Sequence, residues 1–178
     1  MAESIVPREI RTVYDGRIFK VRIETLVLPA GQEMKAEIVR HPGSVVIVPM
    51  TDAGDLILVR QYRPAIGRWA WELPAGSLKE GEIPEAAAAR ECHEEVGLIP
   101  GRLEPLGSFF PTPGYCDEEM HFFRATQLRS AGPEDEAAVR DEDEDIVTGT
   151  FSRDAIVSMI AAREVIDLKT VAGLSLLQ

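Results

Sequence analysis

Three glutamates near the middle of the chain have the types and the spacing that metal chemistry requires. Glu91, Glu94 and Glu95 lie in the segment RECHEEVG, just before Gly97. On an α-helix, at about 100° per residue, Glu91 and Glu95 lie about 40° apart, and Glu94 lies one turn after Glu91. Carboxylates this close repel one another unless a positive charge lies beside them. Because carboxylate oxygens suit hard cations such as Mg²⁺ and Mn²⁺, the cluster predicts a divalent-metal site.

The residues around these glutamates follow a stricter spacing. The segment from Gly76 to Leu98 matches G-x5-E-x7-R-E-U-x-E-E-x-G-U, where U is apolar, without a gap or a substitution. At about one chance in twenty per fixed residue, such a match arises on the order of once in a billion starting points. A solvated acidic helix face, the plain alternative, explains neither the two glycines nor Arg90. The segment resembles the Nudix box, the signature of the Nudix hydrolase superfamily.

This resemblance assigns roles inside the box. It implies that Glu91 and Glu95 are metal ligands and that Glu94 is a catalytic residue, as a further ligand or beside the ligands. It also implies a carbonyl ligand at Ala75 and a substrate contact at Ser77. The role of Arg90 stays open. Since Arg90 and Glu94 are four residues apart, Arg90 can orient a carboxylate, form a surface ion pair or contact the substrate.

Other segments resemble one branch of the superfamily, the bacterial ADP-ribose pyrophosphatases. These segments are WELPAG before the box, PTPGYCDE after it, ETLVLPAG near the N-terminus and the acidic run DEDEDI. In that branch one glutamate of the acidic run acts as the base and the acidic residue two positions later binds metal. These roles fall on Glu142 and Glu144, with Glu144 as the alternative base. The run can also be a solvated acidic loop.

The same resemblance implies the substrate contacts, which lie in four segments. They are Arg63 after the strand LILVRQY, Thr112, Pro113, Gly114 and Glu118 in a loop over the sugar and phosphates, Phe19 against the adenine from the partner subunit, and Arg40, with Lys35 and His41 as alternatives. Each has a structural alternative. Arg63 can be an exposed cation at a strand end, the proline and glycine can form only a turn, and Phe19 can be a core residue. Trp69 and Trp71 are expected in the core.

Most of the chain that must position these residues reads as strands. Residues 9–41 have an alternating pattern with turns at Asp15-Gly16 and Ala30-Gly31, which predicts an antiparallel segment. The run SVVIVPM that follows is nearly continuously apolar, as in a sheet covered on both faces. Pro84 suits the first turn of a helix that continues to Gly97, a natural helix end.

The C-terminal part predicts two more helices, begun by Ser152 and Asp167 as side-chain caps. Helices before and after mixed strands indicate α/β/α layering. The expected fold class is α/β, a Nudix-type α/β/α sandwich with a mixed sheet, preceded by an N-terminal antiparallel β segment. The expected division is residues 1–42 for that segment, which serves dimerisation and substrate binding, and residues 43–178 for the hydrolase domain.

The composition limits the classes of partner that this protein is expected to bind. The 178 residues are 45% apolar and carry a formal net charge of −11, which argues against nucleic-acid binding because a phosphate backbone needs a basic surface. A bound metal can still reverse the sign locally and admit a phosphorylated small molecule. Two cysteines make no disulfide framework. The longest apolar run is too short to cross a bilayer and the N-terminus has no signal pattern, so a soluble cytoplasmic protein with no membrane partner is expected.

Together these features predict a metal-dependent hydrolase that cleaves the pyrophosphate of a nucleoside diphosphate sugar. The resemblance implies ADP-ribose as the first substrate, AMP and ribose 5-phosphate as products, Mg²⁺ or Mn²⁺ as cofactor, and a homodimer. One alternative is another substrate, such as GDP-mannose, a dinucleoside polyphosphate or an oxidised nucleotide. Others are a non-catalytic module that binds a nucleotide sugar, or a protein that uses its acidic surface for interactions. Turnover with Mg²⁺ separates the enzymes from the rest.

Overall fold

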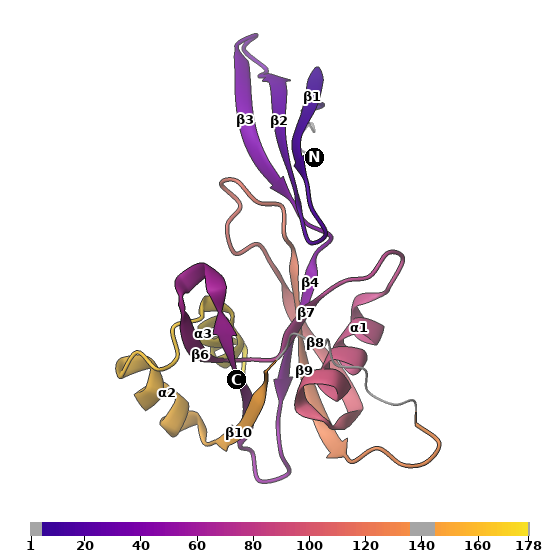
Figure 1. The fold of residues 1–178 in the computed structure, drawn as a ribbon, viewed down its shortest axis with the longest axis vertical. Helices are drawn as coiled ribbons and strands as arrows, with labels where there is room; N and C mark the ends of the chain where they lie inside the picture. The colour runs from indigo at the N-terminus through magenta and orange to yellow at the C-terminus, as the bar shows by residue number, and fades with distance from the viewer. Residues whose placement is uncertain (1–4, 136–144, 178) are drawn as a thin grey trace. The chain divides into compact units, whose positions relative to one another are not determined.

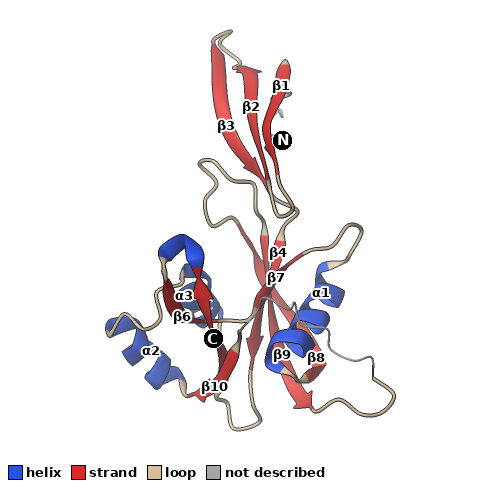
Figure 2. Ribbon diagram, viewed as in Figure 1, coloured by secondary structure: helices blue, strands red, loops and turns tan. Residues whose placement is uncertain are grey.

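The structure is a computed structural model that describes residues 5–135 and 145–177 (Figures 1 and 2). The chain forms two compact units. Unit 1 contains the described residues up to Gly43 together with Phe110–Glu119. Unit 2 contains Ser44–Phe109 and the described residues from Met120 onward.

Unit 1 is built on a three-stranded antiparallel sheet with the order β1-β2-β3. The strands are β1 (Glu9–Asp15), β2 (Lys20–Val27) and β3 (Glu33–Arg40). The predicted turns are confirmed, since the Gly16 amide donates to the Phe19 carbonyl over 3.1 Å and Gly31 has a φ of 86°. The segment Phe110–Glu119 joins the sheet at β3. There the Val39 amide donates to the Tyr115 carbonyl (2.8 Å).

Unit 2 contains two sheets. One has the order β7-β4-β9-β8, and in it β4 pairs with β9 in parallel and with β7 antiparallel, so the predicted mixed sheet is confirmed. The other sheet has the order β10-β5-β6 and is antiparallel. The strand bounds are β4 Ser44–Pro49, β5 Leu56–Arg63, β6 Arg68–Glu72, β7 Ala75–Ser77, β8 Ile99–Phe109, β9 Met120–Arg129 and β10 Val147–Phe151.

Three α-helices belong to unit 2: α1 (Pro84–Glu91), α2 (Arg153–Ala161) and α3 (Leu168–Leu176). Both predicted caps are confirmed. The Ser152 side chain accepts from the Ala155 amide (3.2 Å), and the Asp167 side chain accepts from the Thr170 amide (3.0 Å). None of the helices in the described ranges has the length and apolar composition that crossing a bilayer requires.

The helix that carries the glutamates differs from the prediction in its last turn. The α-helix ends at Glu91 and continues as a wider π-helical turn over Cys92–Val96. Gly97, with a φ of 78°, then ends the helix in a conformation that side chains with a Cβ rarely adopt. The predicted helix up to Gly97 is therefore confirmed, but its last turn is π-helical. Such π turns often occur at functional sites.

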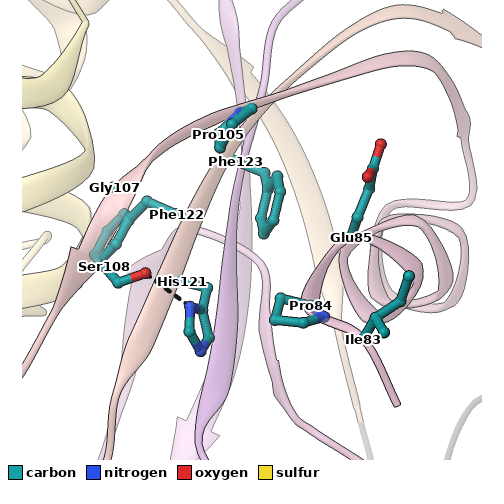
Figure 3. Close-up of a pocket in the computed structure, with 9 residues that line it drawn as sticks. All are labelled: Ile83, Pro84, Glu85, Pro105, Gly107, Ser108, His121, Phe122 and Phe123. Carbon is teal, nitrogen blue, oxygen red and sulfur yellow. Dashed lines mark hydrogen bonds between the residues drawn. The ribbon is translucent and has the colours of Figure 1, made fainter.

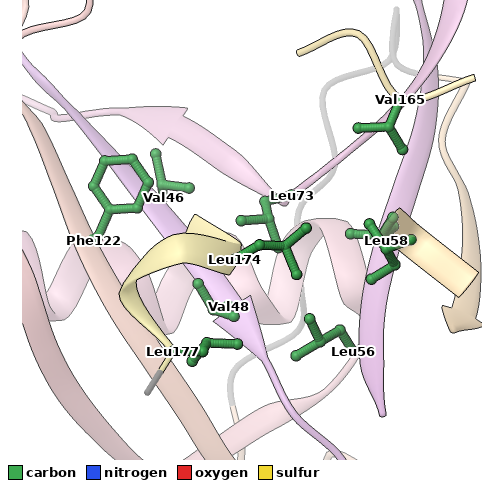
Figure 4. Packing of buried hydrophobic residues seen from close by; sticks show 10 residues of the cluster. Val46, Val48, Leu56, Leu58, Leu73, Phe122, Val165, Leu174 and Leu177 are labelled. Carbon is green, nitrogen blue, oxygen red and sulfur yellow. The ribbon is translucent and has the colours of Figure 1, made fainter. Parts of the chain in front are cut away.

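The core of unit 2 follows from the alternation of β4 (Figure 4). Successive side chains of a strand point to opposite faces. Val46 and Val48 pack with residues of α2 and α3, whereas Val45 and Ile47 pack with residues of α1. All four valine and isoleucine side chains are fully buried. Helices therefore cover both faces, which confirms the α/β/α layering and the near-continuous apolar run.

One core prediction is wrong for one of the two tryptophans. Trp71 packs against the core and lies edge-on to Phe151, with ring centroids 4.9 Å apart. Trp69 is 38% exposed and contacts Tyr62 and Arg60 instead. Trp69 therefore lies outside the core although it is only two residues from Trp71.

Candidate active site

The two predicted metal-binding glutamates meet the backbone of β7. Glu95, only 3% exposed, accepts a hydrogen bond at Oε2 from the Ala75 amide (3.0 Å). The Glu91 carboxylate lies directly on Gly76, because a Cβ at Gly76 would fall 2.0 Å from Glu91 Cδ. The first glycine of the box is therefore required for close approach. The structure brings Glu91, Glu95 and the Ala75–Gly76 peptide together.

Arg90 connects the acidic residues of the box. Its Nε and Nη2 donate to the two carboxylate oxygens of Glu82 (2.8 and 2.9 Å). Its Nη1 donates to Glu91 Oε1 (2.5 Å) and to Glu94 Oε2 (2.8 Å). Among the roles left open for Arg90, this geometry favours the orientation of neighbouring carboxylates. Glu82 in turn orients Arg90.

These ion pairs keep Glu82 and Arg90 charged. The hydrogen bonds from Arg90 lower the pKa of Glu82 to about 2. The hydrogen bond to Glu82, with further ones to Glu91 and Glu94, raises the pKa of Arg90 above its already high ordinary value. Burial and the negative charge of Glu95 raise the pKa of the Cys92 thiol to about 12, so this thiol stays protonated at neutral pH. Cys92 is therefore a packing residue of the helix.

The donor set of this region fits a hard divalent cation. The carboxylates of Glu91 and Glu95 and the carbonyl of Ala75 are all oxygen donors, the type that Mg²⁺ and Mn²⁺ prefer. A carboxylate as deeply buried as Glu95 requires compensation by positive charge or hydrogen bonds. Within residues 5–135 and 145–177, no three Asp, Glu, His or Cys side chains gather into a metal-binding group by themselves. The further predicted ligand, Glu144, lies outside the described residues, as does Glu142.

Arg63, at the end of β5, does not project freely into solvent. Its Nε and Nη2 donate to the two carboxylate oxygens of Glu72, each over 2.8 Å. Lys169 of α3 binds the same carboxylate from another side. The sequence analysis missed Glu72 and Lys169. The available signal was a glutamate inside the apolar strand WAWEL, where an ionised side chain needs a buried partner.

The predicted loop residues lie together in unit 1. Thr112 begins a turn in which its carbonyl accepts from the Tyr115 and Cys116 amides (3.2 and 3.0 Å), with Pro113 and Gly114 between them. Glu118 Oε1 lies 4.0 Å from Nδ1 of His41. The turn interpretation is thus confirmed, whereas contact with a sugar stays a prediction.

Arg40 binds carboxylates of unit 1. Its Nε and Nη2 donate to Oε1 of the buried Glu24 (3.1 and 2.6 Å), and its Nη1 donates to Asp117 Oδ2 (2.9 Å). Asp117 Oδ1 also accepts from the His41 amide (2.8 Å). Arg40 therefore fastens the 110–119 segment to β2 and β3, a role that the sequence analysis did not foresee.

Phe19 and Ser77 complete the predicted contacts. Phe19 is 40% exposed in unit 1 and packs against Tyr14, with ring centroids 5.7 Å apart, so the core interpretation of Phe19 is wrong. Ser77, on β7, is exposed, and its carbonyl accepts a long hydrogen bond from Arg90 Nη2 (3.4 Å). Ser77 thus lies next to the box carboxylates.

A hollow of unit 2 lies between the start of α1 and the strands β8 and β9 (Figure 3). Ser108 and His121 face each other across the two strands, and Ser108 Oγ lies 2.7 Å from His121 Nδ1. The lining of this hollow includes Pro84 and Glu85 but none of the predicted site residues. Glu91, a predicted metal ligand, lies at the other end of α1.

Comparisons with known proteins agree with this geometry. The NUDIX domain family model matches residues 40–169. An ADP-ribose pyrophosphatase from Bacillus subtilis (strain 168) is 36% identical over 178 residues, which cover 100% of this chain and 94% of the relative. A methanol dehydrogenase activator from Bacillus methanolicus is 36% identical over 180 residues, covering 100% of this chain and 96% of the relative.

A solved structure has the same fold. The crystal structure of an ADP compounds hydrolase superposes with a TM-score of 0.81 at 24% identity, covering 99% of this chain and 93% of that one. At this identity the likeness speaks for the fold alone. The family match spans residues 40–169, which include the helix that carries Glu91, Glu94 and Glu95. The chain belongs to the NUDIX domain family of hydrolases.

Proposed function

We propose that this protein hydrolyses the pyrophosphate of ADP-ribose to AMP and ribose 5-phosphate with Mg²⁺ or Mn²⁺. The observation that carries the proposal is the meeting of the Glu91 and Glu95 carboxylates at the Ala75–Gly76 peptide. Support for the substrate comes from the Bacillus subtilis relative, which is named an ADP-ribose pyrophosphatase and matches the whole chain. The similarity therefore includes the N-terminal strands as well as the box.

The proposed metal ligands are the Ala75 carbonyl and the carboxylates of Glu91, Glu95 and Glu144. Nudix hydrolases generally use divalent metals, and a bound ion of this kind offsets phosphate charge and lowers the pKa of a coordinated water. Arg90 keeps Glu91 from rotating away when the ligands are charged, because its Nη1 holds that carboxylate. Pre-orientation of this kind dominates phosphoryl chemistry.

We assign Glu142 as the base that takes a proton from the attacking water, with Glu144 as the alternative. Glu94 is proposed as the third acidic residue at the reaction centre. It is fixed beside Glu91 because both accept from the same nitrogen of Arg90. The order of roles follows the resemblance in the acidic run DEDEDI.

The proposed substrate contacts divide between the units. In unit 2, Arg63 binds a phosphate oxygen with the edge of its guanidinium that Glu72 leaves open, and Ser77 contacts the nucleotide. In unit 1 the proposed contacts are Phe19 with the adenine, Thr112, Pro113, Gly114 and Glu118 with the terminal sugar and phosphates, and Arg40 near the same loop.

The proposed assembly is a cytoplasmic homodimer. Unit 1 exposes many large apolar side chains on a sheet without helices of its own, and such surfaces are typical of interfaces. They are Ile10, Val13, Tyr14, Ile18, Phe19, Val27 and Met34. A two-fold dimer is the commonest way to cover such a surface. The proposed division into residues 1–42 for dimerisation and 43–178 for hydrolysis follows from it.

A substrate comparison tests the proposal. Purified protein with Mg²⁺ is given ADP-ribose, GDP-mannose, a dinucleoside polyphosphate and an oxidised nucleoside triphosphate, and products are separated by chromatography. The proposal expects AMP and ribose 5-phosphate from ADP-ribose, with the highest kcat/KM of the set. A higher kcat/KM for another substrate would reject ADP-ribose. Nucleotide-sugar binding without turnover would support the regulatory module instead.

A second candidate function is activation of a dehydrogenase. It is favoured by the Bacillus methanolicus relative, which is named a methanol dehydrogenase activator and is equally similar over the whole chain. Turnover of a methanol dehydrogenase is measured with and without this protein. Stimulation by the unaltered protein but not by Glu95→Gln would join the two functions, because Glu95 is a proposed metal ligand. No stimulation would leave hydrolysis alone.

A further inference from the structure

The deepest ion-pair cluster of unit 2 surrounds Glu72. This carboxylate is 2% exposed, and two cations bind it. Arg63 donates to both of its oxygens from Nε and Nη2, each over 2.8 Å. The Lys169 ammonium binds Oε2 from α3, 97 residues away in the chain. A buried carboxylate with this many donors has few orientations left.

The cluster continues beyond Lys169 as an alternating series of charges. Lys169 is itself buried and lies 3.1 Å from Asp167 Oδ2. Asp167 also accepts from the amide and the hydroxyl of Thr170, while the Leu73 amide donates to Thr170 Oγ1 (2.8 Å). The first turn of α3 is thus tied to the end of β6 at Glu72 and at the residue after it.

The balance of forces keeps Glu72 ionised. Burial alone would raise the pKa of Glu72, but the hydrogen bonds of Arg63 and the positive charge of Lys169 outweigh it and lower that pKa. Removing one member of a buried charge cluster leaves the others without compensation. Without Lys169, the carboxylates of Glu72 and Asp167 would face each other and Arg63 would be their nearest cation.

Arg63 is the exposed end of the series. Its side chain is 40% exposed, and it lines a cavity of about 400 Å³ together with Ile66, Glu72, Ile166 and Lys169. Glu72 occupies Nε and Nη2, so the Nη1 edge is directed away from the pair. Burial lowers the pKa of Arg63, but the hydrogen bonds and the charge of Glu72 outweigh it and raise that pKa, with a smaller contribution from the negative charge of Glu95. Arg63 therefore lies within electrostatic reach of Glu95, one of the box carboxylates.

We infer that Lys169 and Glu72 are positioning residues, which hold the Arg63 guanidinium ready to bind a phosphate of the substrate. This inference rests on the proposed function, in which Arg63 contacts the pyrophosphate. An arginine that is already fixed loses little rotamer freedom when the substrate arrives, so its hydrogen bonds contribute fully to binding. Through Lys169, the start of α3 supports the substrate site without contacting the substrate.

A double-mutant cycle tests the inference in the full chain. The variants are Lys169→Met, Arg63→Gln and the combination of both. Lys169→Met should lower kcat/KM about 10-fold, the scale of losing an outer support of a binding group. It should change the same parameter, KM or kcat, as Arg63→Gln does. In the Arg63→Gln background the same substitution should cost less than about 2-fold, because the guanidinium that it positions is gone.

Thr170→Val is the matched structural control. It removes a buried hydroxyl from the same turn of α3, and with it the contacts to Leu73 and Asp167, but leaves Lys169 and Glu72 in place. It should lower the thermal midpoint without changing KM or kcat. Equal kinetic losses in Thr170→Val and Lys169→Met would overturn the inference, as would losses in Lys169→Met and Arg63→Gln that simply multiply.

A readout without substrate separates this inference from the proposed function. In ¹H–¹⁵N spectra, the arginine Nε–H signal that disappears in Arg63→Gln belongs to the hydrogen bond with Glu72. It should shift or broaden in Lys169→Met and stay in place in Thr170→Val. An unchanged signal in Lys169→Met would overturn the inference. If the unaltered protein hydrolyses no nucleotide, the proposed function falls, and this signal still decides whether Lys169 positions Arg63.

Discussion

Replacing Gly76 with alanine should displace a metal ligand. The new Cβ would lie 2.0 Å from both Cδ and Oε1 of Glu91, whereas ordinary contacts begin near 3.4 Å. The carboxylate must therefore move by about 1.4 Å. The alanine backbone itself is unstrained, since Gly76 is not among the residues with positive φ. The effect of Gly76→Ala thus reports on the Glu91 position and not on the turn.

The size of the effect follows from the displacement. Moving a catalytic group by about 1 Å costs roughly 10²-fold in rate, which corresponds to about 2.7 kcal/mol of transition-state stabilisation. Because the displaced group is a proposed metal ligand, the Mg²⁺ concentration for half-maximal activity should rise as well. The assay is kcat and KM for ADP-ribose across a Mg²⁺ titration, with thermal unfolding measured in parallel.

Gly132→Ala is the matched control. Its Cβ would lie 3.1 Å from the exposed carboxylate of Glu134, which can swing into solvent, and 3.5 Å from Asp135 Oδ2, an ordinary contact. This variant should keep the kcat/KM and the Mg²⁺ requirement of the unaltered protein. Activity and Mg²⁺ dependence in Gly76→Ala equal to those of Gly132→Ala would refute the argument that close approach of Glu91 to Gly76 builds the metal site.

Other variants test the remaining assignments. Glu95→Gln should lower kcat at least about 10²-fold, because an anionic ligand is lost. A chelator should abolish activity, and turnover that survives dialysis against chelator would contradict a metal mechanism. Glu142→Gln should lower kcat by ~10²–10⁴ with KM nearly unchanged, as for a general base, whereas a small loss would favour the solvated-loop interpretation. Arg90 holds the pKa of Glu82 at about 2, below its ordinary 4.5, so this ionised pair stabilises the fold above pH 4.5 and its contribution is lost as the pH falls towards 2. Denaturant titrations should therefore show a weaker loss of unfolding free energy over that range in Glu82→Gln. Deleting residues 1–41 should convert a species of twice 19.6 kDa into a monomer by light scattering and weaken nucleotide-sugar binding, and a full-length monomer with full activity would contradict the shared site.

The features that sequence analysis predicted well are local. The box spacing, the caps at Ser152 and Asp167 and the alternation of β4 each depend on neighbours within a few residues, so composition and period suffice to recognise them. Where a local pattern continues but the backbone changes, as in the π turn after Glu91, the extent of the helix is predicted and its geometry is not. The exposure of Trp69 was not predicted, because residue type indicates a preference for burial but not which neighbours cover the side chain.

The residues that orient the site were decided by tertiary structure. Glu72 and Lys169 are 97 positions apart, and Arg40 and Asp117 are 77 apart, so no periodic pattern connects them. Their pairing exists because α3 packs beside the end of β6 and because Phe110–Glu119 joins the β3 strand. A sequence by itself determines which carboxylates and cations a chain contains. In the box it also determined their spacing along the helix. Which cation neutralises which buried carboxylate depends on the path of the folded chain, because an ion pair stabilises only the partners that burial brings together.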